Sequence, residues 1–147
     1  MRERSQVQSV AMLVGVVFLL VGILGFIPGI TSNYDDLNFA GHNSDAQLLG
    51  IFDTSILHNI VHLLFGVAGI TLSKTWDGAR TFLIGGGLIY LVLFVYGAIW
   101  HAERASNWIP VNWADNILHL ALGAGMILAG VVLGKEVVRR DAAAPAM

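Results

Sequence analysis

Four long apolar stretches, separated by shorter polar segments, dominate the hydrophobic pattern of this chain. They cover residues 7–27, 52–72, 81–100 and 113–133. Each is close to the roughly 20 residues that an α-helix needs to cross about 30 Å of hydrocarbon. Because backbone amides in lipid must satisfy their own hydrogen bonds, such stretches are expected to be helices. The pattern predicts an all-α integral membrane protein, a four-helix transmembrane bundle forming one domain over residues 1–147.

The basic residues lie almost entirely on one side of these stretches. Seven of the eight Lys and Arg residues flank the chain ends or join the second and third stretches: Arg2, Arg4, Lys74, Arg80, Lys135, Arg139 and Arg140. Cytoplasmic loops carry such an excess, so we expect both termini in the cytoplasm and the protein in the inner membrane of the cell. The expected outer loop, residues 28–50, contains three aspartates and neither Lys nor Arg. The first stretch is too long for a signal-peptide core, so we expect it to be retained.

Composition agrees with a membrane protein and removes several function classes. Hydrophobic residues make up 56% of the 147 residues and charged residues only 12%, with a net charge of -2 and no cysteine. A soluble domain of this length rarely carries so little charge. The absence of cysteine excludes disulfides, thiolate metal sites and thiol catalysis. Without a basic cluster interleaved with aromatic residues, we expect no nucleic-acid partner.

An internal repeat links the second and fourth stretches. Residues 58–66 align without gaps on residues 115–123, and Asn, Ile, His, Leu and Gly coincide. Both helices should run from outside to inside, so the two halves would form a parallel two-helix repeat with a pseudo-twofold axis along the membrane normal. The first and third stretches match poorly, with Gly15 against Gly85 as almost the only correspondence.

The repeated segment carries the main candidate site. His58 and His62 are four residues apart and share one helix face, as do Asp115 and His119. If the pseudo-twofold axis holds, the two faces meet. Three imidazoles and a carboxylate are a suitable ligand set for zinc, iron or copper. Alternatively, His62 and His119 are placed to supply both axial ligands of a b-type haem.

Simpler interpretations stay open for each of these residues. A neutral histidine in a membrane helix often only hydrogen-bonds across a helix interface, which Asn59 and Asn116 would favour. Handling of protons or small solutes is a third interpretation. His101 and His42 are weaker candidates, since interfacial and loop histidines are usually solvated. Small residues spaced by four, and the three consecutive glycines of residues 85–87, are typical of close helix packing, although the latter could also leave room for a flat cofactor.

Several segments resemble a known family. The segments 36–40, 48–50 and 57–66, and a second block over 112–120, are similar to a bacterial family of small four-helix membrane proteins (DUF4383-like) described only as a domain of unknown function. The resemblance covers most of the chain, and the L-H-N-x-V-H-L block is quite specific. It implies the four-span topology and offers no activity, cofactor or catalytic residue to transfer.

The sequence leaves two functional hypotheses. The first is a structural or accessory subunit of a larger membrane complex, or a homo-oligomer, in contact with lipid and with a membrane-protein partner or a second copy. The second is a metal- or haem-binding membrane module that uses His62 and His119, helped by His58 and Asp115. No nucleophile is paired with a base, so we do not expect an enzyme.

Overall fold

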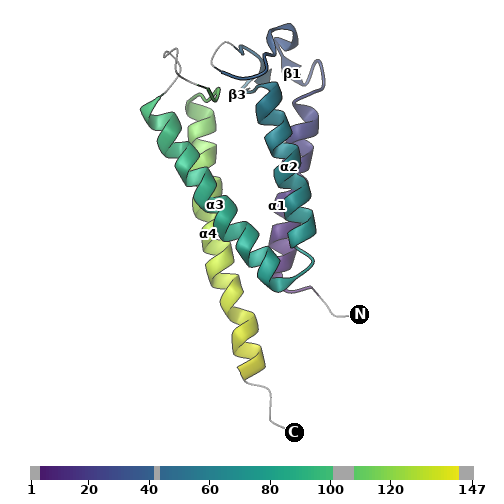
Figure 1. Ribbon diagram of the computed structural model, residues 1–147, viewed down its shortest axis with the longest axis vertical. Coiled ribbons are helices and arrows are strands. Elements are labelled where there is room, and N and C mark those ends of the chain that lie inside the picture. The colour runs from purple at the N-terminus through teal and green to yellow at the C-terminus, as the bar shows by residue number, and fades with distance from the viewer. Residues whose placement is uncertain (1–3, 42–43, 101–107, 143–147) are drawn as a thin grey trace.

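A computed structural model describes residues 4–41, 44–100 and 108–142, with side chains described up to residue 135. Four α-helices account for most of these residues (Figure 1). Their bounds are Gln6–Leu24 for α1, Ile56–Leu72 for α2, Trp76–Ile99 for α3 and Trp113–Ala142 for α4. The described part of the chain is therefore an α-helical bundle, as the hydrophobic pattern predicts.

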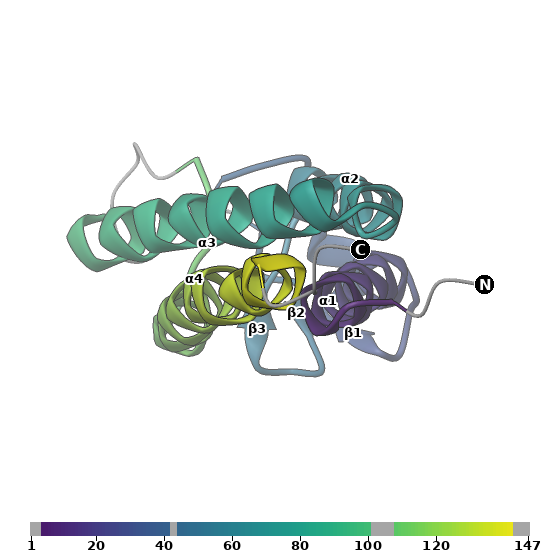
Figure 2. The same ribbon diagram turned by 90° about the horizontal axis from the view of Figure 1, so that it is seen from below.

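The helices form two hairpin-like pairs. α1 packs mainly against α2, and α3 mainly against α4. Figure 1 shows the two pairs diverging toward the end that carries the strands, whereas the start of α3 lies beside α1 and α2 at the opposite end. Figure 2, along the bundle, shows α1 and α2 at one side and α3 and α4 crossing toward the other. The buried core where the pairs meet comprises Val7, Ala11, Phe18, Ala79, Phe82, Leu83, Tyr90 and Met126.

Glycines set the close approach within each pair. A methyl group added at Gly15 of α1 would lie 2.7 Å from the backbone nitrogen of Ile70 and 2.9 Å from the carbonyl carbon of Gly69 in α2. In the second pair, a methyl group at Gly87 of α3 would lie 2.8 Å from the carbonyl oxygen of Gly123 in α4. These distances are shorter than van der Waals contact, so only glycine allows the observed helix spacing.

A small antiparallel sheet covers one end of the bundle. It consists of β1 (Thr31–Ser32), β2 (Gln47–Leu48) and β3 (Phe52–Asp53), in the order β1-β2-β3, with a 3₁₀ turn at Tyr34–Asp36. We expected residues 28–50 to be a loop and the second helix to start at residue 52, and both expectations need correction. Phe52 and Asp53 pair with β2, so the helix starts only after Ser55, whose side chain accepts a hydrogen bond from the His58 backbone N–H.

Other helix ends also differ from the hydropathy pattern. α3 starts at Trp76 instead of residue 81, because the Thr75 hydroxyl oxygen caps it by accepting a hydrogen bond from the Gly78 backbone N–H. α1 ends at Leu24, three residues before the expected end, and α4 continues to Ala142. Such polar caps decide where a helix begins, whereas average hydropathy does not register them.

Within the described residues, three helices are long and apolar enough to cross a membrane: α1, α3, and residues Trp113–Lys135 of α4. α2 is also apolar but has only 17 residues. Each helix exposes large aliphatic side chains on its outer face, including Leu13, Leu64, Val92 and Leu128, each more than 60% exposed. A water-soluble bundle would cover such a surface, whereas lipid solvates it. The chain is a small membrane protein.

Candidate functional site

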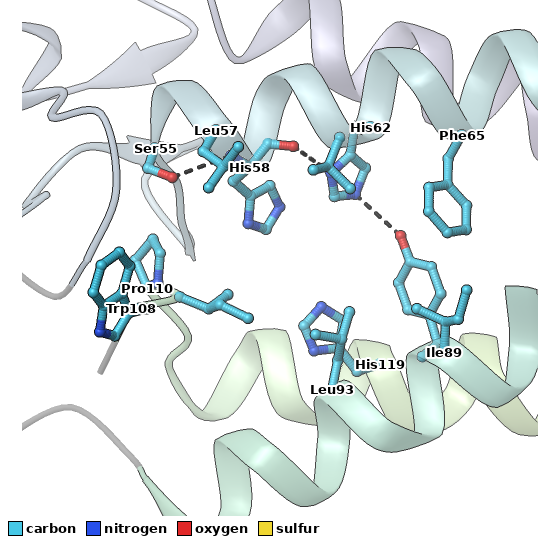
Figure 3. Close-up of a pocket in the computed structure, with 13 residues that line it drawn as sticks. Ser55, Leu57, His58, His62, Phe65, Ile89, Leu93, Trp108, Pro110 and His119 are labelled. Atoms are coloured by element: carbon cyan, nitrogen blue, oxygen red, sulfur yellow. Dashed lines mark hydrogen bonds between the residues drawn. The ribbon is translucent and has the colours of Figure 1, made fainter. Parts of the chain in front are cut away.

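The structure brings three of the predicted site residues to one cavity. His58 and His62 reach it from α2, and His119 reaches it from α4 on the opposite side (Figure 3). The cavity has a volume of about 130 Å³ and opens between α2 and α3. Its other walls are mostly apolar: Leu57, Val61, Phe65, Ile89, Leu93 and the segment 108–110. We call this space the histidine cavity.

A second cavity adjoins the same side chains from the α1 and α4 side. Its volume is about 100 Å³, and its walls again include His58, His62 and His119, together with Asp115. It is closed by Val21 of α1, by Leu118 and Leu122 of α4, by the sheet residues Leu48 and Phe52, and by Leu49 in the turn between them. The three histidines therefore separate two small spaces between the helix pairs.

Tyr90 of α3 belongs to the same site, although sequence reasoning did not single it out. Its side chain is 4% exposed and borders both cavities. The Tyr90 hydroxyl oxygen lies 3.3 Å from Nε2 of His62, and Nδ1 of His62 lies 3.0 Å from the His58 carbonyl oxygen (Figure 3). A carbonyl oxygen only accepts, so Nδ1 of a neutral His62 carries the proton and Nε2 accepts from the tyrosine. Both nitrogens of His62 are therefore used.

Aromatic contacts hold these side chains in place. The rings of His58 and His62 stack at a centroid distance of 4.4 Å and an angle of 8°. Phe18 of α1 stacks on Tyr90 at 5.3 Å and meets His62 edge-on at 5.7 Å. Tyr90 in turn meets His119 edge-on at 5.3 Å. Packed aromatic pairs of this kind restrict the rotation of every ring in the group.

His119 has an unsatisfied polar atom. Its side chain is 4% exposed, and its buried Nδ1 atom has no hydrogen-bond partner among the residues that the structure describes. A buried polar atom without a partner costs about 1–3 kcal/mol, and native structures contain few of them. The His119 ring also lines both cavities, so atoms of the ring other than the buried Nδ1 can meet a molecule inside them.

Asp115 takes part in a hydrogen-bond network with backbone groups of β3 and at the start of α4. One carboxylate oxygen, Oδ2, accepts hydrogen bonds from the backbone N–H groups of Asp53 and Asn112, each at 3.0 Å. The Asn112 side chain in turn accepts from the Asp115 backbone N–H and donates to the Ile51 carbonyl oxygen. This network joins β3 to the start of α4. It fixes the sheet over the cavities and occupies one oxygen of the predicted metal ligand.

The predicted metal and haem sites receive no support from this arrangement. Among the residues that the structure describes, no three His, Asp or Glu side chains are grouped so that they could hold a metal ion. A haem iron at Nε2 of His62 would have to displace the Tyr90 hydroxyl. Both sites stay predictions. His42 and His101 lie outside the described residues.

The two asparagines of the repeated segment lie at helix contacts. Asn59 packs on Gly25 at the end of α1, and Asn116 packs on Gly97 of α3. Both side chains are at most 1% exposed. The Asn59 amide oxygen accepts a hydrogen bond of 2.6 Å from the Thr54 hydroxyl, whereas neither amide atom of Asn116 has a partner. Among the described residues, neither asparagine side chain hydrogen-bonds to a histidine as expected, and both pack on glycine instead.

Comparison with known proteins gives a family without an activity. The family model described as "Domain of unknown function (DUF4383)" matches residues 8–132. No curated protein and no solved structure matches the chain.

Proposed function

Because this chain belongs to the DUF4383 family, whose description names no activity, we propose a function from the site alone: the protein binds a small, largely apolar molecule within the membrane, in the histidine cavity. The single observation that carries the proposal is the cavity itself, a mostly apolar space of about 130 Å³ on which His58, His62 and His119 converge. A mostly apolar pocket with a few convergent polar groups is the usual form of a small-molecule site.

The position of the cavity supports entry from the lipid. Its mouth lies between α2 and α3, and the side chains around it include Leu57, Val61 and Ile89, each 38–48% exposed on the apolar surface of the bundle. A polar ligand would have to leave water and cross this apolar rim, at a cost of several kcal/mol for each unpaired polar group. An apolar molecule dissolved in the bilayer would cross it freely.

Hydrogen bonding is favoured over metal ligation as the chemistry of this site. His62 has both nitrogens engaged by protein groups, and one oxygen of Asp115 is engaged by two backbone N–H groups. Ligation of iron, zinc or copper through Nε2 of His62 would require the bond with Tyr90 to break, and Asp115 could ligate only through its other oxygen. The haem or metal alternative is therefore the weaker proposal.

The contacts of the described helices also support our inference of a two-helix repeat. Offsets of 72 residues between α1 and α3, and of 57 between α2 and α4, pair residues with the same contacts. Gly25 on Asn59 corresponds to Gly97 on Asn116. The edge-on ring pair of Phe18 and His62 corresponds to that of Tyr90 and His119. On these contacts the counterpart of Gly15 is Gly87 instead of Gly85.

The remaining expectations about membrane placement form part of the same proposal. α2, with 17 residues, reaches the lower limit for a span, so four spans and cytoplasmic termini in the inner membrane remain our model. An accessory role in a larger complex or self-association is compatible with ligand binding. Gly85 and Gly125 support it, since neither has a neighbour within 4 Å of an added methyl group.

The proposal is tested by filling the cavity. Val61→Trp would place an indole in the histidine cavity, whereas Val67→Trp lies on the same helix, 56% exposed, and lines neither cavity. Toluene, a small apolar probe, would be titrated calorimetrically into each protein in nanodiscs, with empty nanodiscs as the baseline. We expect saturable binding to the wild type and to Val67→Trp, and none to Val61→Trp. Equal binding to all three proteins, or to none, would overturn the proposal.

A further inference from the structure

The hydrogen-bonding roles of the cavity residues restrict which polar group a ligand can carry. His62 holds its proton on Nδ1, because that atom faces the His58 carbonyl oxygen at 3.0 Å. The Tyr90 hydroxyl must then donate its proton to Nε2 of His62. This bond uses the only hydrogen of the Tyr90 hydroxyl. Toward a ligand, the Tyr90 oxygen can therefore only accept a hydrogen bond. Tyr90 is therefore an acceptor toward the cavity.

His119 offers the opposite role. A proton on its Nδ1 would leave a buried N–H without an acceptor, and buried orphan N–H groups are rarer than under-satisfied acceptors. The favoured neutral tautomer therefore carries its proton on Nε2. This N–H is the donor available to a molecule in the cavities that the ring lines. Tyr90 and His119 are neighbours, with ring centroids 5.3 Å apart, so acceptor and donor belong to adjacent side chains.

A hydroxyl group satisfies this pair, because it can accept from His119 and donate to Tyr90 at the same time. A carbonyl or ether oxygen would satisfy His119 alone, and a hydrocarbon neither. The open space beside His119 is visible in Figure 3, with His58 facing it from α2. His58 has no hydrogen bond from its ring and adds a further nitrogen on the same space.

The size and walls of the cavity indicate what carries the hydroxyl. Its volume is about 130 Å³, and an apolar cavity of about 150 Å³ takes up benzene. Phe65, Tyr90 and Trp108 give it aromatic walls, against which a planar ring packs edge-on or offset. The mouth between α2 and α3 leaves room for an apolar chain on such a ring to extend into the lipid.

From these roles and dimensions we infer that the histidine cavity recognises a hydroxyl-bearing aromatic ring, a phenol, by a hydrogen bond from His119 and one to Tyr90. This inference rests on the proposed function and specifies its ligand class. His119 is a binding residue that donates a hydrogen bond to the ligand hydroxyl, and Tyr90 accepts one from it.

Three probes of nearly equal size test this inference separately from the proposed function on which it rests. Phenol both donates and accepts, anisole only accepts, and toluene does neither. Their affinities would be measured by calorimetry on the full protein in nanodiscs, each corrected for partitioning into empty nanodiscs. We expect phenol to bind about three- to tenfold more tightly than anisole, the range that one hydrogen bond supplies. Equal affinities for phenol and anisole would overturn the inference and leave the proposed function standing, whereas binding of none of the three would overturn both.

Two variants test the hydrogen bond from His119. His119→Leu removes the N–H at similar bulk and should abolish the preference of anisole over toluene, because neither probe can then accept a hydrogen bond, while toluene binding persists. His119→Gln keeps an N–H donor and should retain part of the preference. An unchanged preference in His119→Leu would overturn the assignment. If this variant does not fold, ¹⁵N NMR of the wild type decides instead: phenol, but not toluene, should shift the ring nitrogens of His119, and no shift would overturn the inference.

Discussion

Alanine at Gly15 should push α1 and α2 apart, and the structure gives the size of the effect. The added methyl carbon would lie 2.7 Å from the Ile70 nitrogen and 2.9 Å from the Gly69 carbonyl carbon. Favourable contacts between carbon atoms begin at about 3.5 Å. Both neighbours are backbone atoms, which cannot rotate away as a side chain can. The helix pair must therefore separate by several tenths of an ångström along its contact.

The magnitude combines two opposing effects. Overpacking in a close contact costs about 1–3 kcal/mol, whereas replacing a helical glycine by alanine gains about 0.5–1 kcal/mol. Gly85→Ala is the matched control, because its methyl group meets nothing within 4 Å and only the gain applies. We expect Gly15→Ala to be less stable than Gly85→Ala by about 1–3 kcal/mol.

The assay is reversible unfolding by SDS in mixed micelles, followed by circular dichroism. Gly15→Ala should lower the free energy of unfolding or leave it near that of the wild type, and Gly85→Ala should raise it. If both variants gained equal stability, the close approach of α1 and α2 would not exist in the membrane-embedded protein. The reasoning on glycine contacts would then be refuted.

Three further predictions concern the site and its surroundings. Phe18→Tyr should be tolerated or should stabilise by about 1 kcal/mol, since the repeat relates Phe18 to Tyr90 and would direct the new hydroxyl to His119; a loss of about 1–3 kcal/mol would speak against the repeat. Asp115→Ala should cost about 2–3 kcal/mol by leaving two backbone N–H groups without their acceptor, whereas Asp35→Ala, exposed on the sheet side, should change unfolding little. An absorption spectrum with elemental analysis should show neither a Soret band nor a stoichiometric metal, and either signal, if lost in His119→Ala, would revive the cofactor hypothesis.

The sequence predicted the helices well and their ends poorly. Hydropathy detects which segments are apolar, and four apolar segments became four helices. It cannot detect that Phe52 pairs with Leu48 in a sheet, because the pairing depends on residues brought together only by the turn between them. The Thr75 cap adds five residues to the start of α3 for a similar reason. A local hydrogen bond outweighs the average polarity of the segment.

The candidate site was predicted in part. The spacing of four placed His58 and His62 on one face, and the repeat placed His119 opposite, so the three histidines were recognisable from the sequence. Tyr90 was not, since a tyrosine inside an apolar helix looks like any other aromatic packing residue. The only sequence signal for Tyr90 was its correspondence with Phe18 in an alignment of α1 with α3. The sequence alignment, however, matched Gly15 with Gly85 in place of Gly87. A shift of two residues hides the match of Phe18 with Tyr90.

The proposed repeat explains why these two kinds of residue differ in predictability. Positions that are identical in both halves serve close packing, as Gly25 and Gly97 do against Asn59 and Asn116. A contact this close tolerates no residue other than glycine, so both halves retain the same glycine and asparagine. Positions that differ include Phe18 and Tyr90, which stack on each other beside the cavities. Only the tyrosine carries a hydroxyl, so the contact with His62 exists on one side alone. Together with the pairing of His58 with Asp115 in the repeat, that difference makes the proposed site asymmetric, with one donor and one acceptor for a ligand that binds in one orientation.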